Sequence, residues 1–400
     1  MIEIQDKIEC CGCTACANIC PKKAISMVED EEGFKYPKID KKKCIDCGLC
    51  DKICPIKNQK DETNIKQDAY IVRTKKYEVL KKSTSGGFFT PLSEYVLEQN
   101  GVVYGVAYDN DMNIVHMEIS DKTDIQKLIG SKYIQSDLND IFLKVKIKLE
   151  NGKLVLFSGT PCQVYGLKSF LRKEYDNLIT MDLVCHGVPS KKLWNSYKFY
   201  QEKKYKSKIK QAFFRNKTYG YHSATMRLVF ENGKQYDGSA LVDFMLKPFF
   251  AGIALRESCY DCKFKTKNHS TDFTVFDSWH VSEIVKDLND DDKGYTNVMV
   301  NTKKAADILE LIKDKIYFYK VDKEKIIKLD GKMVEASEIP HKNRKDFYKS
   351  IDDVGIEKTI KKYIPVKIKE KIWEKLKKYI YKIGLLKKIK NIKKRMKSKR

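Results

Sequence analysis

The sequence predicts three consecutive parts: a small α+β head, a larger α/β domain built on a mixed or parallel sheet, and a basic helical tail. Two closely spaced runs of four cysteines in residues 10–54 define the head. Strand-like and helix-like segments then alternate, which is typical of helices packed around such a sheet. The last part is rich in lysine, with apolar residues at helical spacing. We place the head at 1–58, a polar linker at 59–69, the large domain at 70–345 and the tail at 346–400.

The composition is that of a folded protein, because 42% of the residues are hydrophobic. No segment approaches the roughly 20 apolar residues of a membrane span, and the first ten residues lack the apolar core of a signal peptide. We therefore expect a cytoplasmic protein whose cysteines stay reduced and free to bind metal. Of the formal net charge of +24, residues 357–400 hold +16, with 19 Lys or Arg against three Glu. The body is only mildly basic, and we expect no nucleic-acid partner.

The cysteine spacing of the head is typical of iron–sulfur proteins. Both runs have the spacing C-x2-C-x2-C-x3-C followed by proline, at Cys10, Cys13, Cys16 and Cys20 and again at Cys44, Cys47, Cys50 and Cys54. In two-cluster ferredoxins the fourth cysteine of such a run ligates the other cluster. We therefore assign one [4Fe-4S] cluster to Cys10, Cys13, Cys16 and Cys54, and the second to Cys44, Cys47, Cys50 and Cys20. Residues 24–28 and 34–39, between the runs, are expected to form a β-hairpin.

Zinc is the alternative metal for these cysteines. Zinc sites usually join one CxxC pair to a distant second pair, so the triple run closed by Cys-Pro favours iron–sulfur clusters. Cys11 lies outside the repeated spacing, and we expect it to be a spare thiol beside a cluster.

The pattern of the large domain places its elements in alternation. We expect strands at 69–73, 102–108, 113–120, 154–159 and 178–185, and helices at 88–100, 137–151, 161–173 and 191–204. Three turns between them have the character of phosphate-binding segments, with Gly86 and Gly87 before a helix, Gly159 followed by Thr160 as an N-cap, and Gly130, Ser131 and Lys132 in a third loop. Ordinary turn chemistry is the alternative for each. Neither the GxGxxG fingerprint of a nicotinamide-binding Rossmann fold nor a P-loop is present.

Four cysteines remain after the head is accounted for: Cys162, Cys185, Cys259 and Cys262. Cys162 and Cys185 follow predicted strands, at the edge where α/β sheets place their sites. The four thiols together suit a third [4Fe-4S] cluster. Alternatively, Cys162 and Cys185 are small buried hydrophobic residues, and the pair Cys259 and Cys262 binds nothing or forms a local redox pair. The residues alone leave both interpretations open.

Several of these segments occur together in one known family. They are 83–97 (STSGGFFTPLSEYVL), 128–136 (LIGSKYIQS), 155–167 (VLFSGTPCQVYGL), 182–190 (DLVCHGVPS) and 259–279 (CYDCKFKTKNHSTDFTVFDSW). Together with the head, these segments cover roughly residues 5–300. They stand in the order found in the β-subunit family of the coenzyme F-420 (deazaflavin) hydrogenases and dehydrogenases, which the chain resembles.

The resemblance implies a ferredoxin-like two-cluster head followed by an α/β mixed-sheet flavin domain. It implies that FAD is bound by Ser85, Gly86, Gly87, Gly130, Ser131, Lys132, Gly159 and Thr160, with Lys132 near the pyrophosphate. It also favours a third cluster on Cys162, Cys185, Cys259 and Cys262. Asp272 and Asp277 match acidic positions of the family's last block, whereas Phe276 stands where a glycine is expected.

The function implied is that of an iron–sulfur flavoprotein oxidoreductase. Electrons would pass from the [4Fe-4S] clusters to FAD and on to a small organic acceptor, a deazaflavin or another conjugated or sugar-linked compound. An electron-donor protein or a partner enzyme subunit is the expected protein partner. The alternative is a ferredoxin-type electron-carrier subunit whose large domain docks a partner enzyme. No catalytic residue is assigned, and for His186 and His280 a surface or structural role is favoured over proton donation.

The tail predicts a basic amphipathic helix. Its apolar positions follow helical spacing, at Ile368, Ile372, Leu376, Ile380, Ile383, Leu386, Ile389 and Ile392. With lysines on the other face, such a helix suits an anionic membrane surface, and the protein would then be peripheral on the inner face of the membrane. A terminal helix packed on the body or on a partner is the alternative.

Overall fold

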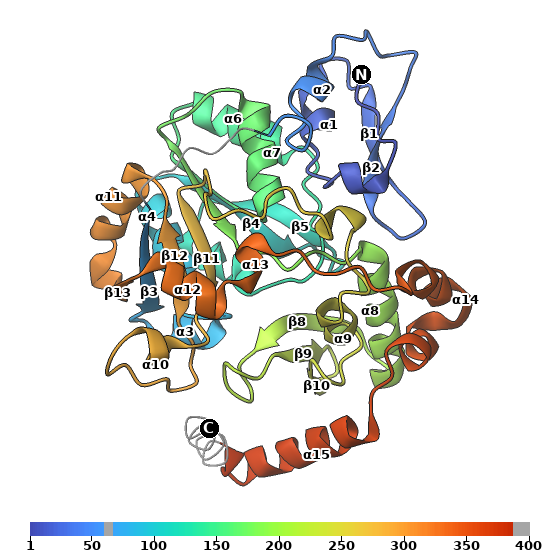
Figure 1. Cartoon of the computed structure of the whole chain (residues 1–400), viewed down its shortest axis with the longest axis vertical. Helices are drawn as coiled ribbons and strands as arrows, with labels where there is room; N and C mark the ends of the chain where they lie inside the picture. Colours follow the sequence, from blue (N-terminus) through green and yellow to red (C-terminus); the bar gives the residue numbers. More distant parts are fainter. Residues whose placement is uncertain (60–66, 387–400) are drawn as a thin grey trace.

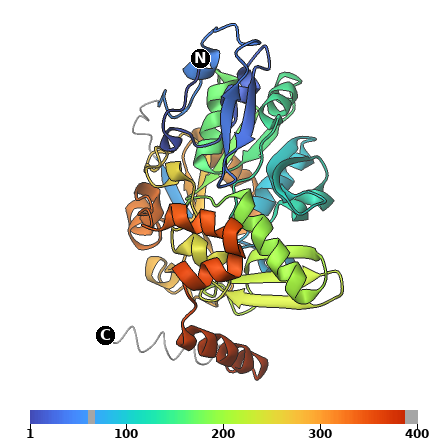
Figure 2. The ribbon, with the colours of Figure 1, turned by 90° about the vertical axis from the view of Figure 1, so that its right-hand side faces the viewer.

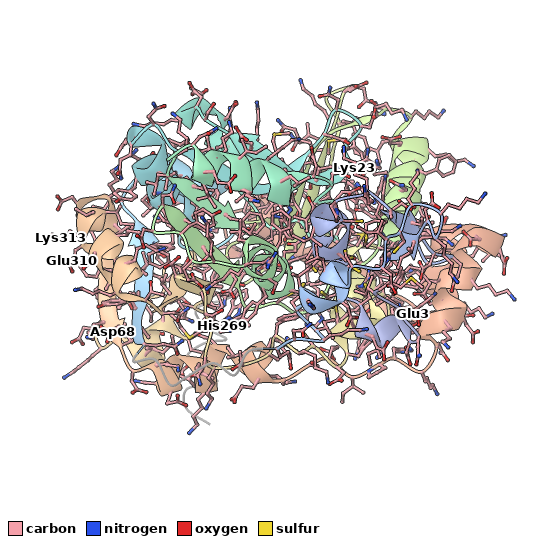
Figure 3. All side chains as sticks on the ribbon, turned by 90° about the horizontal axis from the view of Figure 1, so that it is seen from above. Glu3, Lys23, Asp68, His269, Glu310 and Lys313 are labelled. Atoms are coloured by element: carbon pink, nitrogen blue, oxygen red, sulfur yellow. The ribbon has the colours of Figure 1, made fainter. Side chains whose placement is uncertain are left out.

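The computed structural model describes residues 1–59 and 67–386. The head forms one end of the molecule and contains the hairpin β1 (Ile25–Glu29) and β2 (Lys35–Ile39), paired antiparallel. Its helical turns are η1 (Lys7–Glu9), α1 (Ala15–Ile19) and α2 (Leu49–Lys52). The hairpin predicted at 24–28 and 34–39 is confirmed. Seen from above, Glu3 and Lys23 of the head lie to the right of centre, whereas Glu310 and Lys313 lie at the left edge (Figure 3).

The large domain is built on an eight-stranded mixed sheet in the order β13-β3-β12-β11-β7-β6-β4-β5 (Figure 1). The strands are β3 (Asp68–Thr74), β4 (Val102–Tyr108), β5 (Ile114–Ile119), β6 (Val155–Ser158), β7 (Leu178–Leu183), β11 (Phe273–Asp277), β12 (Thr296–Val300) and β13 (Ile316–Val321). The four central strands β4, β6, β7 and β11 run parallel, and antiparallel strands flank them on both sides. The predicted mixed-sheet α/β architecture is confirmed.

Helices cover both faces of this sheet, and the apolar runs of the central strands are buried on both sides, as is typical of parallel strands. Along β6, Leu156 packs with helices α4 (Phe89–Glu98), α5 (Ile125–Leu128) and α11 (Lys303–Leu311). Its neighbours Val155 and Phe157 face α6 (Ile141–Glu150) and α7 (Pro161–Leu171) on the other side. That second face also carries α10 (Val281–Ile284), α12 (Lys323–Asp330) and α13 (Lys332–Glu335), while α3 (Tyr77–Lys82) follows β3.

The carboxyl ends of the parallel strands share one edge, and helix α7 begins there after β6. Thr160 caps α7 in a capping box with Gln163, and Pro161 occupies the first turn, where its missing N–H costs nothing. The head packs against α6 and α7, so that Cys11, Cys13 and Ala15 belong to the same apolar cluster as Phe142 and Val164. The sheet edge and the head therefore meet along α7.

A second lobe, of which the sequence pattern predicted only the helix at 191–204, lies beside the large sheet. It contains the antiparallel strands β8 (Ile209–Asn216), β9 (Thr225–Phe230) and β10 (Gln235–Ser239), with α8 (Lys191–Tyr205), α9 (Leu246–Phe250) and the short turn η3 (Glu257–Cys259). Helix α14 (Arg344–Tyr363) crosses the predicted boundary at 345 and packs on α8, burying Phe347, Tyr348 and Ile351. Residues 346–363 are thus part of the folded body.

The exposed part of the predicted tail is helix α15 (Ile368–Lys382), which lies beneath the second lobe at the far end from the head (Figures 1 and 2). Ile389 and Ile392 of the predicted pattern lie outside the described residues. In residues 1–59 and 67–386, no helix has both the length and the apolar character that a membrane crossing requires.

Candidate functional site

Two cavities of the head are lined by cysteine side chains, and each draws on both runs. One, of about 370 Å³, is lined by Cys20 together with Cys44, Cys47 and Cys50. The other, of about 330 Å³, is lined by Cys54 together with Cys10, Cys13 and Cys16. The structure therefore brings the cysteines together in the two crossed sets that the spacing predicts.

The surroundings of these cavities suit iron–sulfur clusters. Apolar side chains, among them Ile25 and Ile39 in one cavity and Ile2 and Met27 in the other, complete the walls. Backbone N–H groups already point at two of the sulfurs, from Ile2 to Cys50 Sγ at 3.2 Å and from Ala24 to Cys20 Sγ at 3.3 Å. Such donors stabilise charge on thiolate sulfur. Among the described residues no three Cys, His, Asp or Glu side chains converge closely enough to hold a single metal ion.

The cysteine loops turn at residues whose backbone is in the left-handed region, one just before each short helix. Gly48 precedes α2 at φ +70°, and Thr14 precedes α1 at φ 63°. Gly12, at φ +69°, is also closely approached, since a Cβ there would lie 2.7 Å from Gln135 Nε2 and 3.0 Å from Arg256 Nη1. This position requires glycine for both reasons.

The four remaining cysteines of the large domain lie within electrostatic range of one another. Burial raises the pKa of Cys185 to about 12, and the neighbouring Cys162 adds to the rise. Burial likewise raises the pKa of Cys262 to about 11, again with a contribution from Cys162. Cys259 packs on Gly187, where a Cβ would lie 3.2 Å from the cysteine Cβ. Cys162 follows β6 and Cys185 follows β7, so both stand at the carboxyl edge, as predicted.

Cys11 connects this third set to the head, a role that its position outside the spacing did not reveal. Cys11 belongs to the same buried cluster as Cys13, and Cys162 packs against that cluster. The Cys11 thiol lies near enough to those of Cys13 and Cys162 for each to affect its pKa. It is 8% exposed, so the contact is sealed from solvent. Helix α7, which starts beside Cys162, also passes Cys13, because a Cβ on Gly166 would lie 2.7 Å from that cysteine's Cβ. The first and third cysteine sets are therefore adjacent.

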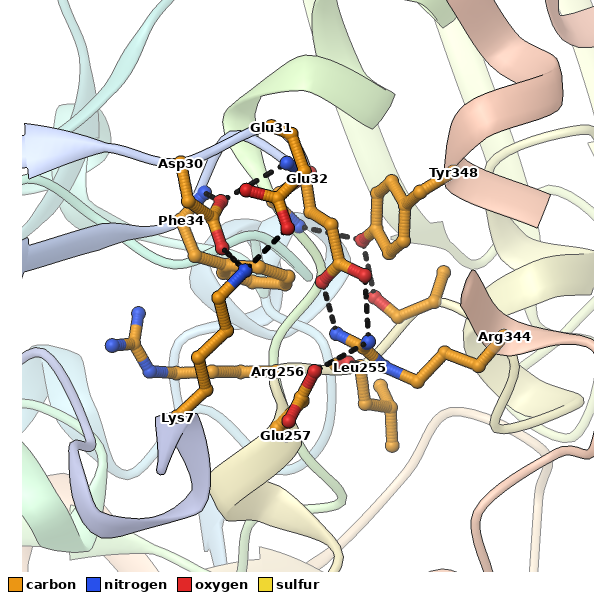
Figure 4. Close-up of polar contacts among 12 residues, drawn as sticks. Lys7, Asp30, Glu31, Glu32, Phe34, Leu255, Arg256, Glu257, Arg344 and Tyr348 are labelled. Carbon is orange, nitrogen blue, oxygen red and sulfur yellow. Dashed lines mark hydrogen bonds and ion pairs between the residues drawn. The ribbon is translucent and has the colours of Figure 1, made fainter. Parts of the chain in front are cut away.

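Ion pairs and hydrogen bonds join the head to the large domain near this junction (Figure 4). Arg344 donates two hydrogen bonds to the Glu32 carboxylate, of 2.8 and 2.5 Å, and its Nη1 lies 3.3 Å from Glu257 Oε1. Lys192 donates to the Glu31 carbonyl oxygen at 2.5 Å. Bidentate arginine–carboxylate pairs fix orientation as well as contact, so the head is held in one position.

A basic cavity of about 340 Å³ lies between the end of α3 with the two residues that follow it (81–84), the loop at 129–132 and strand β8. Its lining includes five cationic side chains and no carboxylate: Lys81, Lys82, Lys132, Arg215 and Lys217. Gly130, Ser131 and Lys132, which we predict to contact the flavin nucleotide, line it, and the Ser131 N–H donates to Thr84 Oγ1 at 2.9 Å. We call it the anion cavity.

Two lysines of the anion cavity have no carboxylate partner within the described ranges. Lys217 Nζ donates only to backbone carbonyls, of Leu80 at 2.9 Å and of Ser85 and Lys293 at 2.6 Å. Lys132 Nζ likewise reaches the carbonyls of Ile129 at 3.3 Å and Gly130 at 3.2 Å. Burial lowers the pKa of each lysine to about 7. A bound anion would offset the free-energy cost of burying the charged lysine side chains, so the cavity is complementary to phosphate.

The other predicted nucleotide-binding residues lie elsewhere. Gly86 is buried against the sheet, where a Cβ would come within 2.3 Å of the Val72 carbonyl oxygen, so packing alone requires glycine there. Gly87 is buried beside Thr74, and Ser85 Oγ is 2.8 Å from Thr296 Oγ1. It is the preceding Ser83 and Thr84 that line the anion cavity.

Gly159 and Thr160 lie beside the third cysteine set. Thr160 Oγ1 is 3.2 Å from Cys162 Sγ, and its backbone N–H donates to the Gln163 side chain at 3.0 Å. The structure therefore places the predicted residues at three separate places instead of one.

The acidic and histidine positions have mainly structural partners. Asp272 accepts hydrogen bonds from Thr180 and Thr302 and so ties β7 to the start of α11. Phe276 lies in regular strand β11 and is buried against α10, so this backbone does not need the glycine that the resemblance led us to expect. His186 bonds the Phe249 carbonyl oxygen at 3.1 Å, and His280 Nδ1 lies 2.7 Å from Asp330.

An aromatic group beside the anion cavity does not follow from the sequence pattern. Tyr221 and Trp279 stack with ring centroids 4.5 Å apart, and the Arg215 guanidinium lies 4.8 Å from the Trp279 ring. Asp277 accepts from Arg215 at 2.8 Å and from the Tyr221 hydroxyl at 2.9 Å. These residues come from β8, the loop after it and the end of β11, and no short sequence motif joins them.

Comparisons with known proteins match two segments of the chain. Residues 9–58 match the family model of the 4Fe-4S dicluster domain, and residues 152–326 match that of the C terminus of the coenzyme F420 hydrogenase/dehydrogenase beta subunit. No curated protein matches the chain. Among solved structures, a chain of the F420-reducing [NiFe] hydrogenase complex from Methanosarcina barkeri is 17% identical with a TM-score of 0.45, covering 71% of this chain and 92% of that one. The two family matches show that this chain joins a 4Fe-4S dicluster domain to the C-terminal domain of the coenzyme F420 hydrogenase/dehydrogenase beta-subunit family.

Proposed function

We propose that the protein is an iron–sulfur flavoprotein oxidoreductase that passes electrons from [4Fe-4S] clusters to FAD and on to a small organic acceptor. The observation that carries the proposal is the junction at Cys11, where Cys11 and Cys13 of the head share one buried cluster with Cys162 of the large domain, and Cys13 packs on Gly166 of α7. Sites that exchange electrons must lie close together, and this contact makes the two cysteine sets neighbours.

The ligands proposed for the first two clusters are the crossed sets of the head. Cys10, Cys13, Cys16 and Cys54 would hold one cluster, and Cys44, Cys47, Cys50 and Cys20 the other. Cys162, Cys185, Cys259 and Cys262 would hold a third, between the head and the sheet edge. Because burial raises the pKa of these last thiols, cluster assembly there must release protons.

FAD is proposed to place its phosphates in the anion cavity, where Lys132 and Lys217 supply the positive charge and Thr84 and Ser131 the hydroxyl groups. The stacked pair Tyr221 and Trp279 beside the cavity offers an aromatic surface for a planar ring. Bound flavin supplies the change from one-electron to two-electron chemistry. The protein's own part is to bind the phosphates, hold the ring near the third cysteine set and keep water away from it.

The acceptor would be a deazaflavin or another conjugated or sugar-linked compound, and the electrons would come from a donor protein or a partner subunit. The alternative is an electron-carrier subunit whose large domain docks a partner enzyme. Anaerobic turnover of the purified chain distinguishes the two. We expect the chain alone, with bound FAD and a strong artificial reductant, to reduce such an acceptor. Clusters that become reduced while no acceptor reacts until a partner enzyme is added would favour the carrier.

Helix α15 further supports a peripheral position on an anionic membrane surface. Its polar side faces the body, where Glu374 accepts from Ser239 Oγ at 2.7 Å and Glu370 pairs with Lys247 at 3.3 Å. Of the predicted apolar positions, Ile380 and Leu386 are buried beside Tyr219 of the body. The others that the structure describes form, with Tyr379, an apolar stripe that is turned outward and exposed: Ile368 76%, Ile372 61%, Leu376 46%, Tyr379 63% and Ile383 48%.

Exposed lysines border this stripe on both sides: Lys369, Lys371, Lys375 and Lys382. An apolar stripe bordered by lysines matches the boundary between acyl chains and anionic headgroups, and each basic residue near the surface adds about 1 kcal/mol. We propose that the protein is cytoplasmic and binds the inner face of the membrane through α15.

Cosedimentation with lipid vesicles tests this position. The double substitution I372D/L376D is expected to weaken binding to phosphatidylserine-containing vesicles more than tenfold, because burying two such side chains contributes about 3 kcal/mol or more. As a control, L311D changes an exposed leucine of α11 and should bind as wild type does. Equal binding of I372D/L376D and wild type, or no binding of wild type to anionic vesicles, would contradict the proposal.

A further inference from the structure

A fully buried arginine without a carboxylate partner lies where the head meets the large domain. Arg256 is 0% exposed. Its Nε donates to the Cys10 carbonyl oxygen at 2.7 Å, Nη1 to Gln135 Oε1 at 3.0 Å and Nη2 to the Lys35 carbonyl oxygen at 3.0 Å. The guanidinium also stacks on Tyr36, 4.2 Å from its ring centroid. All these partners are neutral.

The neighbouring Arg344 lies in the same interface and is also buried, but carboxylates neutralise its charge. It is 6% exposed and pairs with Glu32 and Glu257. In Figure 4 dashed lines join Arg344 to these carboxylates, whereas the Arg256 guanidinium points away from them. Within the described part of the chain no carboxylate forms an ion pair with Arg256. An unpaired charge so deeply buried costs several kcal/mol, so this guanidinium requires a negative partner of another kind.

The groups around Arg256 that can carry negative charge are cysteines and Tyr36, and burial raises the pKa of Tyr36 so that its hydroxyl stays neutral. Cys10 and Cys11 approach it from the head, and Cys259 from the large domain. Cys162, at the start of α7, also lies within its electrostatic range. The loop of the head is shaped around the guanidinium as well, because a side chain at Gly12 would meet Arg256 Nη1 at 3.0 Å.

We infer that Arg256 is the shared counter-charge of the two cysteine-bound clusters that meet at the junction, and that it raises the reduction potential of at least one of them. The inference rests on the proposed cluster sites. Four thiolates around a doubly positive four-iron core leave a net negative charge, and each added electron increases it. A fixed cation nearby favours that added electron, and water cannot screen it here. The same charge also attracts the head to the large domain once the clusters are in place.

Redox titration of the reconstituted protein, followed by electron paramagnetic resonance, tests this inference. The neutral variant R256Q is expected to lower the equilibrium constant for reduction of at least one cluster by about tenfold or more, which is about 59 mV for a one-electron couple. R256K keeps the charge and should stay near wild type. The control R344Q removes the paired arginine of the same interface and should leave the potentials unchanged.

If R256Q incorporates its clusters poorly, a second variant that moves the positive charge to a neighbouring position still tests the inference. In R256Q/Q135K a cation returns from the adjacent side chain, and it should restore both iron content and potential. Potentials in a folded R256Q equal to those of wild type, or no recovery in R256Q/Q135K, would overturn the inference while leaving the proposed function intact. Wild-type protein without four-iron clusters would instead overturn the proposed function and this inference with it.

Discussion

Replacing Cys259 with alanine is expected to remove about four of about twelve irons and to stop electron flow from the head to the flavin. A cluster that loses one of its four thiolates is generally unstable, and the other three proposed ligands lie around the same buried site. The head does not depend on Cys259, since its two cavities are lined by other cysteines. Its clusters should therefore still form and still be reduced.

The control for this substitution is C11A, which removes a cysteine that belongs to none of the three sets. It should retain all the irons. Iron and sulfide analysis, combined with anaerobic reduction of bound FAD by a low-potential donor, measures both properties. Full iron content and unchanged flavin reduction in C259A would show that Cys259 is a buried structural thiol and not a ligand.

Replacing Lys217 with methionine is expected to weaken FAD binding by about 10- to 100-fold, because a hydrogen bond to a charged group contributes roughly 1.5–3 kcal/mol. Lys217 lines the anion cavity and has no carboxylate partner there, so a phosphate would be its principal counter-charge. K132M should act in the same direction. K320M is the control, since Lys320 is exposed on β13 and pairs with Asp68. Equilibrium dialysis against FAD measures the effect, and equal affinities in K217M and K320M would contradict it.

The same lysines predict how FAD affinity depends on pH. Burial lowers the pKa of Lys132 and of Lys217 to about 7 in the free protein; for Lys217, Arg73 and Arg215 lower it further, while Asp277 and Asp291 oppose them. A bound phosphate favours the charged amine and raises these pKa values. Below pH 7 the lysines are already protonated and binding needs no proton. Above pH 7 each must take up a proton, so affinity should fall, by up to about tenfold per pH unit for each lysine. K217M should show a shallower fall.

The cysteine framework could be predicted from the sequence because metal ligands in such loops are set by local spacing. The crossed arrangement of Cys20 and Cys54 follows from that spacing alone. The strands before Cys162 and Cys185 were equally predictable, since runs such as residues 154–158 are apolar throughout and end in a turn. Parallel strands bring their carboxyl ends to one edge, and that places the two cysteines near each other.

What the sequence could not show depends on contacts between distant segments. Arg256 meets Cys10 across most of the chain. Lys217 lines the anion cavity and Trp279 lies against its Arg215, and the two come from different elements without a motif. Gly86 looked like a phosphate-binding glycine because packing against Val72 and nucleotide binding select the same residue type. The orientation of α15 was also hidden, since the pattern of an amphipathic helix does not say which face the body covers.

Anaerobic analysis of iron, acid-labile sulfide, zinc and flavin in the wild-type protein tests the central claim most directly. Three cysteine sets that each hold a four-iron cluster, next to one flavin site, predict about twelve irons, about twelve sulfides and one FAD per chain. About eight irons with no flavin would leave only the head as a redox site. Zinc bound in place of iron in the head would contradict the whole account.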